Sequence, residues 1–243
     1  MPYSENHTKT AQSPGYTVQN EVKNLLGSHF KNLESPSLRL NKMMVFPIQG
    51  AGELNAVCAC INEHGKKLSG PVYDIPGMIS FRLKLAARMM IDQSGSVLNL
   101  GIRLHRNFSC PYIPGSALKG VTRHYAFQNC EDTDKLNRIF GNQERAGSVA
   151  FLNAFPADSN WKMVVDVLTK HNDPEEEHLD TKKTTPIFFP AVEKGAVFTF
   201  HVVPLKHDAG NDAEQAVKLI KSALMEWGIG AKTSAGYGWF KEI

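Results

Sequence analysis

The 243-residue sequence lacks the patterns that mark several large protein classes. It has no run of about eighteen apolar residues, which a membrane-spanning helix needs. Its first twenty residues are polar, without the apolar segment of a signal peptide. Its four cysteines, Cys58, Cys60, Cys110 and Cys130, show no zinc-binding spacing, and unpaired cysteines suit a reducing compartment. We therefore expect a cytoplasmic protein with no membrane segment and no metal site.

Catalytic signatures are also missing. The sequence contains no H-E-x-x-H, C-x-x-C or G-x-S-x-G motif and no usefully spaced pair of aspartates. One alternative stays open, because His124 and Tyr125 could act as general acid or base in metal-free RNA cleavage. A structural or surface histidine is the preferred interpretation of His124, since the sequence offers it no catalytic partner. We expect no catalytic residue and no cofactor.

Neither sign of charge dominates overall, because the net charge is only +3. The distribution is more informative than the total. Residues 79–140 hold nine Lys or Arg against four Asp or Glu, a net charge of +5. A basic segment of this kind favours a polyanionic partner.

Glycine is abundant in one place, the C-terminal stretch Gly228–Gly238, which also holds Lys232. Glycine lets the backbone adopt positive φ and approach a ligand, and successive N–H groups can form an anion-binding concavity. A nucleotide-binding P-loop is rejected, because it follows a strand and opens a helix, and here the order is reversed. The alternative is a flexible turn.

A second glycine-bearing turn, Pro114-Gly115, precedes a predicted helix with Ser116 as its N-cap. Lys119 would then stand in the first turn, where a cation opposes the helix dipole. A bound phosphate shared by the free N–H groups and Lys119 would offset this. The alternative is an exposed lysine that tolerates a weak penalty.

The hydrophobic pattern predicts an α+β domain. Ile79–Leu85 alternates apolar and polar residues, as in a strand with one wet, basic face. Apolar residues recur at helical spacing from Ala213 to Trp227. Further strands are expected at 149–155, 161–169, 196–205 and 237–243, and further helices at 51–63, 121–127 and 134–140. From Ile79 the order strand, helix, strand, strand, helix, strand is that of a ferredoxin-like (RRM-like) βαββαβ domain.

Three regions are expected along the chain. Residues 1–20 are rich in Ser, Thr, Asn and Gln and predict a disordered lead-in. Residues 21–78 form an N-terminal extension packed on the core, with a short helix at 21–30 and an ambiguous segment at 38–46. Residues 79–243 form the ferredoxin-like domain, with a polar, acidic insertion around 171–187.

Three stretches resemble a known family. Ile113-Pro-Gly-Ser-Ala-Leu-Lys-Gly120 followed by Arg123 resembles the "IPGSSLKG…R" segment of the RAMP superfamily of CRISPR proteins, with Ala117 where serine is common. Phe140-Gly141 together with Gly147–Pro156 resembles the next family block, and Gly228–Gly238 resembles the C-terminal glycine-rich loop. Residues 165–183 and 186–200 look like the sixth subunit of type III-B (Cmr) effector complexes. The resemblance covers roughly residues 79–243.

The resemblance implies a non-catalytic RNA-binding structural subunit that holds the guide RNA backbone near its 3′ end, in antiviral defence. Its partners would be the CRISPR guide RNA, other Cmr subunits and, as a second RNA that it could contact, target RNA. Together with the glycine turns and the basic segment, it predicts the RNA-binding residues Gly115, Ser116, Lys119, Arg123, Arg103, Arg106, Gly228, Gly230, Lys232, Thr233, Ser234 and Gly236. Lys119 and Lys232 are expected to flank one RNA strand.

Two rival functions stay open. The first is a RAMP-type endoribonuclease that processes precursor CRISPR RNA through His124 or Tyr125. The second is a free-standing RRM-like RNA binder. Such a binder stacks bases on aromatic side chains of its central strands, and Ile79–Leu85 offers only Phe81, which is expected to face the core.

Overall fold

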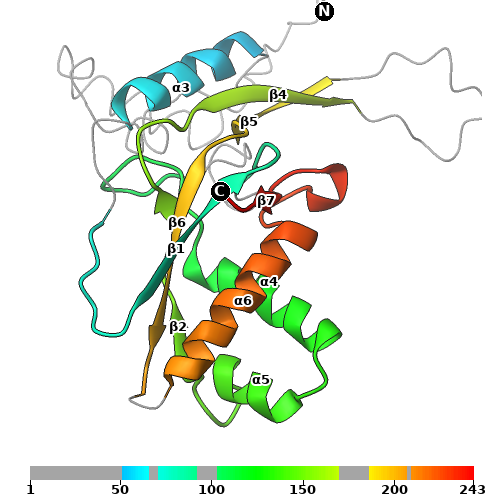
Figure 1. Ribbon diagram of the computed structural model, residues 1–243. Coiled ribbons are helices and arrows are strands. Elements are labelled where there is room, and N and C mark those ends of the chain that lie inside the picture. The colour runs from blue at the N-terminus through cyan, green and yellow to red at the C-terminus, as the bar shows by residue number, and fades with distance from the viewer. Residues whose placement is uncertain (1–50, 66–70, 92–102, 170–185, 207–208) are drawn as a thin grey trace, which may run out of the picture.

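The fold is an antiparallel sheet covered by helices on one face, as the computed structural model in Figure 1 shows. The structure describes residues 51–65, 71–91, 103–169, 186–206 and 209–243. The covering helices are α4 (Gly115–Asn129), α5 (Thr133–Phe140) and α6 (Gly210–Glu226). The α+β class predicted from the sequence is confirmed.

The central strand β1 (Ile79–Leu85) has the predicted bounds. It pairs antiparallel with β6 (Val197–Pro204) on one side and with β7 (Phe240–Lys241) on the other. Leu83 is fully buried opposite Phe198, whereas Arg82 on the other face is exposed. Phe81 is half-buried and stacks on Phe200 with a ring separation of 5.3 Å. Alternation of side chains along the strand thus places its apolar set under the helices.

The other edge of β6 carries two short strands, β2 (Val149–Phe151) and β3 (Phe155–Pro156). The strand order is β2-β6-β1-β7. The single strand expected at 149–155 is therefore interrupted. Between β2 and β3 the chain pairs elsewhere: Ala154 forms an isolated bridge with Ile113, just before α4.

A second sheet consists of β4 (Met163–Thr169) and β5 (Pro186–Val192), covered by α3 (Ala51–His64). The side chain of Asn62 on α3 accepts a hydrogen bond from Met163 N at 2.7 Å and donates one to Met163 O at 2.9 Å. This amide occupies the free edge of β4. Pro186 and Ile187, which lie within the insertion expected around 171–187, belong to β5.

The start of α4 corrects the sequence prediction. The helix begins at Gly115 with Pro114 as N-cap, and no side chain of the capping residue bonds to the helix. Asn153 Oδ1 instead accepts from Gly115 N at 2.9 Å. Ser116 is therefore not the N-cap, and Lys119 is the fifth helical residue, beyond the first turn. The cap was missed because its acceptor lies 38 residues away in the sequence.

The C-terminal segment follows the prediction in outline. Helix α6 carries its buried apolar stripe at the expected spacing and ends beside Trp227. The glycine-rich stretch 228–238 then folds back and leads into β7. The strand expected at 237–243 is confined to two residues, because Gly238 adopts φ +74° and turns the chain before Phe240. The segments predicted at residues 1–20, 21–30 and 38–46 lie outside the described residues.

Candidate nucleic-acid interface

A groove of about 760 Å³ runs between the first turns of α4, the turn at residues 141–147 and the edge strand β2. We call it the basic groove. Lys119 and Arg123 line it from α4, and Arg145 lines it from the turn. Among the described residues that line it, none is acidic. Three cations without a balancing anion make a positive surface suited to a polyanion.

The turn at residues 141–147 places Arg145. Asn142 Oδ1 accepts from the backbone N–H groups of Glu144 at 3.0 Å and Arg145 at 2.8 Å, so the side chain closes the turn on itself. Gly147 packs against Ile139, where an added Cβ would lie 2.4 Å from the carbonyl oxygen. Arg145 was not among the residues predicted from the sequence. The available signal was the Gly-Asn-x-x-Arg turn directly after the predicted helix at 134–140.

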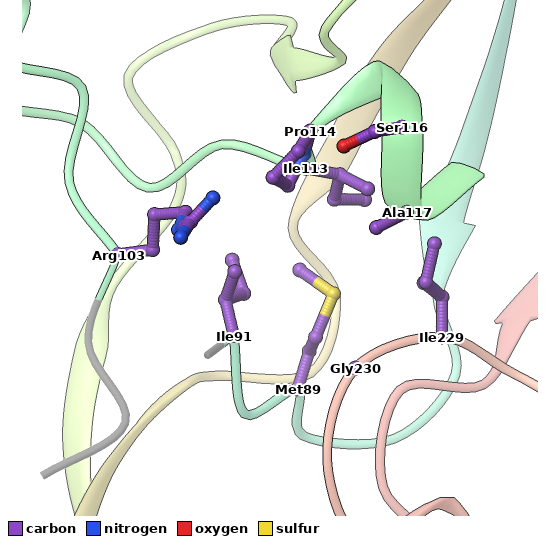
Figure 2. Close-up of a pocket in the computed structure, with 9 residues that line it drawn as sticks. All are labelled: Met89, Ile91, Arg103, Ile113, Pro114, Ser116, Ala117, Ile229 and Gly230. Carbon is purple, nitrogen blue, oxygen red and sulfur yellow. The ribbon is translucent and has the colours of Figure 1, made fainter. Parts of the chain in front are cut away.

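A second hollow, of about 350 Å³, lies where the two glycine-bearing segments meet. We call it the apolar cavity. Figure 2 shows its walls, which come from the chain after β1 (Met89, Ile91), the approach to α4 (Ile113, Pro114, Ser116, Ala117) and the C-terminal loop (Ile229, Gly230). Arg103 points its guanidinium group toward the space between Pro114 and Ile91. The structure thus brings residues 113–117 and 229–230 together around one cavity.

The packing of the chain against itself requires glycine at two positions, one in the C-terminal loop and one at the start of α4. Gly230 has φ +102°, and an added Cβ would lie 2.3 Å from Met90 O. Gly115 is buried, and a Cβ there would lie 2.1 Å from Phe151 O. These glycines permit close packing between segments of this protein. Their presence therefore needs no approaching ligand.

Arg88 anchors the C-terminal loop to the second sheet. Its guanidinium group lies 3.0 Å from Asp166 Oδ2 on β4 and 3.1 Å from Glu193 Oε1 just after β5. Tyr237 of the loop donates its hydroxyl to Asp166 Oδ2 at 2.7 Å. Hydrogen bonds from Arg88 lower the pKa of Glu193, and burial together with Asp166 raises the pKa of Tyr237 to about 12. The loop and the β4–β5 sheet are therefore held by one charged cluster.

The predicted RNA-binding residues fall into three groups. Arg103, Ser116 and Gly230 line the apolar cavity, and Gly115, Ser116, Lys119 and Arg123 line the basic groove. Arg106, Gly228, Lys232, Thr233, Ser234 and Gly236 line neither. Lys119 and Lys232 therefore do not line a common hollow. Their expected role on one RNA strand stays a prediction.

Lys232 has a conformation that is rare for a residue with a side chain. Its φ is +62°, in the left-handed region, and it precedes the 3₁₀ turn η4 (Thr233–Ala235). Its ammonium group lies 5.7 Å from the centre of the Phe189 ring on β5. Trp239 Nε1 donates to Thr233 O at 3.1 Å and closes the same loop. Within the described residues, Lys232 thus faces the β4–β5 sheet.

The two residues considered for catalysis have structural neighbours. Tyr125 is buried, and its hydroxyl donates to Glu226 Oε1 at 2.8 Å on α6. Burial, followed by Glu226, raises the pKa of Tyr125. His124 is exposed, with its ring 5.2 Å from that of Trp227 and its Nε2 3.4 Å from Gln128 Nε2. This part of α4 makes a packing contact with α6.

Membrane and metal signatures are absent from the part of the chain that the structure describes. No helix there is long and apolar enough to cross a membrane. No group of three His, Cys, Asp or Glu side chains among those residues could hold a metal ion. None of the four cysteines, all of which lie in the described part of the chain, forms a disulfide.

The family of this chain follows from its sequence pattern. The pattern of the RAMP superfamily matches residues 27–241, so the chain belongs to the RAMP superfamily. This corrects the extent of the resemblance, which the motifs had placed only from Ile79 onward. Residues 27–78 lack the glycine motifs on which the resemblance was based. Helix α3 therefore lies within the region that the family pattern matches.

Two curated relatives carry a more specific name. The chain is 29% identical to "CRISPR system Cmr subunit Cmr6" of Pyrococcus furiosus, over 66% of this chain and 66% of that protein. It is 29% identical to "CRISPR system CMR subunit Cmr6" of Saccharolobus solfataricus, over 68% of this chain and 57% of that protein. The chain thus spans two thirds or less of the length of these relatives.

The fold also resembles that of a solved chain. The solved chain comes from a cryo-EM structure of the type III-B Cmr-beta complex bound to cognate target RNA. The TM-score is 0.57, the sequence identity is 20%, and the match covers 93% of the present chain and 87% of the solved one. At this identity the likeness concerns the fold.

Proposed function

We propose that this protein is an RNA-binding structural subunit of a type III-B CRISPR effector complex, and that its basic groove holds RNA by the phosphate backbone. One observation carries the proposal. Lys119, Arg123 and Arg145 line a single groove in which no described residue is acidic. Phosphate contacts of this kind position an RNA strand without reading its sequence. Two relatives bearing the Cmr6 name support the assignment to this complex.

The proposal includes the partners and the compartment. They are the CRISPR guide RNA, held near its 3′ end, target RNA as a further contact, and the other Cmr subunits. The solved Cmr-beta complex is bound to cognate target RNA, which supports an RNA partner. In guide-bound complexes base pairing reads the sequence, so backbone contacts suffice for the protein. The cytoplasm is the proposed location.

We further assign the ferredoxin-like topology to the sheet. Counted from β1 and without α5, β4, β5 and η4, the order is strand β1, helix α4, strands β2 and β3, strand β6, helix α6 and strand β7. The spatial order β2-β6-β1-β7, antiparallel throughout, supports this assignment. The β4–β5 hairpin is then an insertion between the second and third strands of the unit.

The proposal gives this chain no catalytic step. The endoribonuclease alternative needs a proton-transferring residue that reaches RNA, and Tyr125 is instead buried against Glu226. His124 contacts Trp227 and Gln128, neither of which carries a negative charge that would stabilise an imidazolium during proton transfer. The free-standing RRM-like binder needs stacking aromatics on the open sheet face, and Phe81 is stacked on Phe200 beneath the helices.

The groove is tested by charge removal. Lys119→Ala and Arg123→Ala should each weaken binding of single-stranded RNA to the full chain by roughly three- to tenfold, for any sequence. The slope of log affinity against log salt should fall by roughly 0.7 for each variant, one phosphate's share. Fluorescence anisotropy across a salt series measures both quantities.

The control is Lys218→Ala. Lys218 is exposed on α6 and lines neither hollow, so its removal changes net charge equally without touching the groove. Equal salt slopes for Lys119→Ala, Arg123→Ala and Lys218→Ala would show that RNA does not use the groove. Thermal melts of the three variants confirm folding.

A further inference from the structure

The apolar cavity has a composition different from that of the basic groove. Met89, Ile91, Ile113 and Ile229 are each less than 10% exposed and form its walls. Its volume of about 350 Å³ lies within the range of small-molecule sites. A mostly apolar pocket with a few polar groups fits a ligand with a flat apolar body and a polar edge.

Polar groups lie at two places on the wall of this cavity, on either side of Pro114. Arg103 extends its guanidinium group toward the cavity, and the hydroxyl of Ser116 lies at its rim. Ser116 and Ala117 belong to the first turn of α4, where backbone N–H groups have no acceptor within the helix. All of these are hydrogen-bond donors. They match the carbonyl oxygens and ring nitrogens that a nucleobase presents at its edge.

The cavity also lies next to the basic groove. Ser116 lines both hollows, the cavity and the groove. Lys119 and Arg123 follow on the groove side of α4, one and two turns further along. A strand whose phosphates lie in the groove would therefore have a base within reach of the cavity.

We propose that the apolar cavity binds one unstacked nucleobase of the RNA strand whose phosphates occupy the basic groove. This rests on the proposed function and adds a base-binding subsite to it. A phosphate alone would forgo the four apolar walls, and Arg103 is the one cation among the described residues that line the cavity. An apolar side chain of a partner protein could also fill the cavity. Such a partner would not account for the three cations in the neighbouring groove.

The test fills the cavity without changing charge. Ala117 lines it from an exposed position on α4, and leucine is a good helix former, so Ala117→Leu should fold and occupy the space. The probes are an oligoadenylate and a stable abasic ribose-phosphate strand of equal length. Gln128→Leu is the control, because it adds the same side chain at an exposed site on α4 outside both hollows.

The expected result is base-dependent. Ala117→Leu should bind oligoadenylate about tenfold more weakly than the wild type, because the added side chain displaces the base from the apolar walls. It should bind the abasic strand equally well and keep the wild-type salt slope, because no phosphate contact is lost. Gln128→Leu should match the wild type on both strands.

Three outcomes would overturn the inference. Wild-type binding of oligoadenylate by Ala117→Leu would show that no base enters the cavity. An equal loss on both strands would show that the cavity region holds only backbone. Failure of a partner subunit to associate, with RNA binding intact, would assign the cavity to protein. Each leaves the Lys119 and Arg123 salt slopes in place, so the proposed groove stands or fails separately.

Discussion

At the scale of single residues, Asp212 is the most heavily bonded carboxylate that the structure describes. It is 5% exposed, accepts from Arg138 Nη2 at 2.7 Å and from Ser148 Oγ at 2.7 Å, and lies in the first turn of α6. These bonds join α6 to α5 and to the start of β2. Helix α5 and strand β2 also flank the turn that carries Arg145. The bonds of Asp212 therefore help to fix the position of one wall of the basic groove.

Asp212→Asn should destabilise the protein at neutral pH by roughly 2–3 kcal/mol, because the amide nitrogen faces a guanidinium group and one charge-assisted pair is lost. Hydrogen bonds from Arg138 lower the pKa of Asp212 below its ordinary 3.8, against the effect of burial. Its contribution is therefore present above that pH and is lost as the pH falls through the folded-state pKa. Urea unfolding across a pH series measures both effects.

The matched control for this carboxylate is Glu214→Gln. Glu214 is exposed two residues further along α6, so its neutralisation should leave the unfolding midpoint nearly unchanged. A stability difference between wild type and Asp212→Asn that stays constant down to acid pH would contradict the assigned pKa direction.

At the scale of elements, glycine has different roles in α4 and in the C-terminal loop. Gly120 lies within α4 with open space around it, and its φ is ordinary. Gly236 has φ +89° with nothing nearby. Gly230 combines φ +102° with the close approach of Met90 O. The three positions separate helix propensity, backbone strain and steric contact.

Alanine at these positions should give a graded series. Gly120→Ala should stabilise the protein by about 0.5–1 kcal/mol, through helix propensity and a less flexible unfolded chain. Gly236→Ala should destabilise it by roughly 1 kcal/mol, the cost of positive φ. Gly230→Ala should cost more than Gly236→Ala, because Met90 must also move. Chemical denaturation measures the free energy of unfolding of the three variants. Equal losses for Gly230→Ala and Gly236→Ala would show that Met90 moves aside at no cost in stability.

At the scale of the whole molecule, one core joins the two sheets. The buried cluster includes Ile61 of α3 and Met163 of β4 together with Leu83 of β1 and Ile220 of α6. The Arg88 cluster adds a charged link between the same parts. We therefore expect the described parts of the chain to unfold as one cooperative unit.

Asn62→Ala tests this expectation. It removes the two hydrogen bonds to Met163 and should lower stability by roughly 1–3 kcal/mol. Trp161, beside the second sheet, and Trp227, beside α6, should still report one transition that coincides with far-UV circular dichroism. Asn55→Ala, at an exposed position on α3, is the control. Two separated transitions would show that α3 and the β4–β5 sheet unfold independently.

Much of the fold could be predicted from local patterns. The alternation of Ile79–Leu85 predicted β1 with its observed bounds, and the apolar spacing from Ala213 to Trp227 predicted α6. Both succeeded because one face of each element packs on the core, so burial imposes the period of the element on the sequence. Part of the site was also predictable, because Lys119 and Arg123 are four residues apart and therefore lie on one face of α4.

Other features depended on contacts between distant segments. The sequence by itself determined the α+β class, the central strand, the main helices and the basic character of α4. Only the tertiary structure decided that Asn153 caps α4, that Arg145 joins Lys119 and Arg123, and that Lys232 turns toward Phe189. The physical reason is range: periodicity reports which face of an element is buried, whereas a groove is made by side chains whose partners lie tens of residues away.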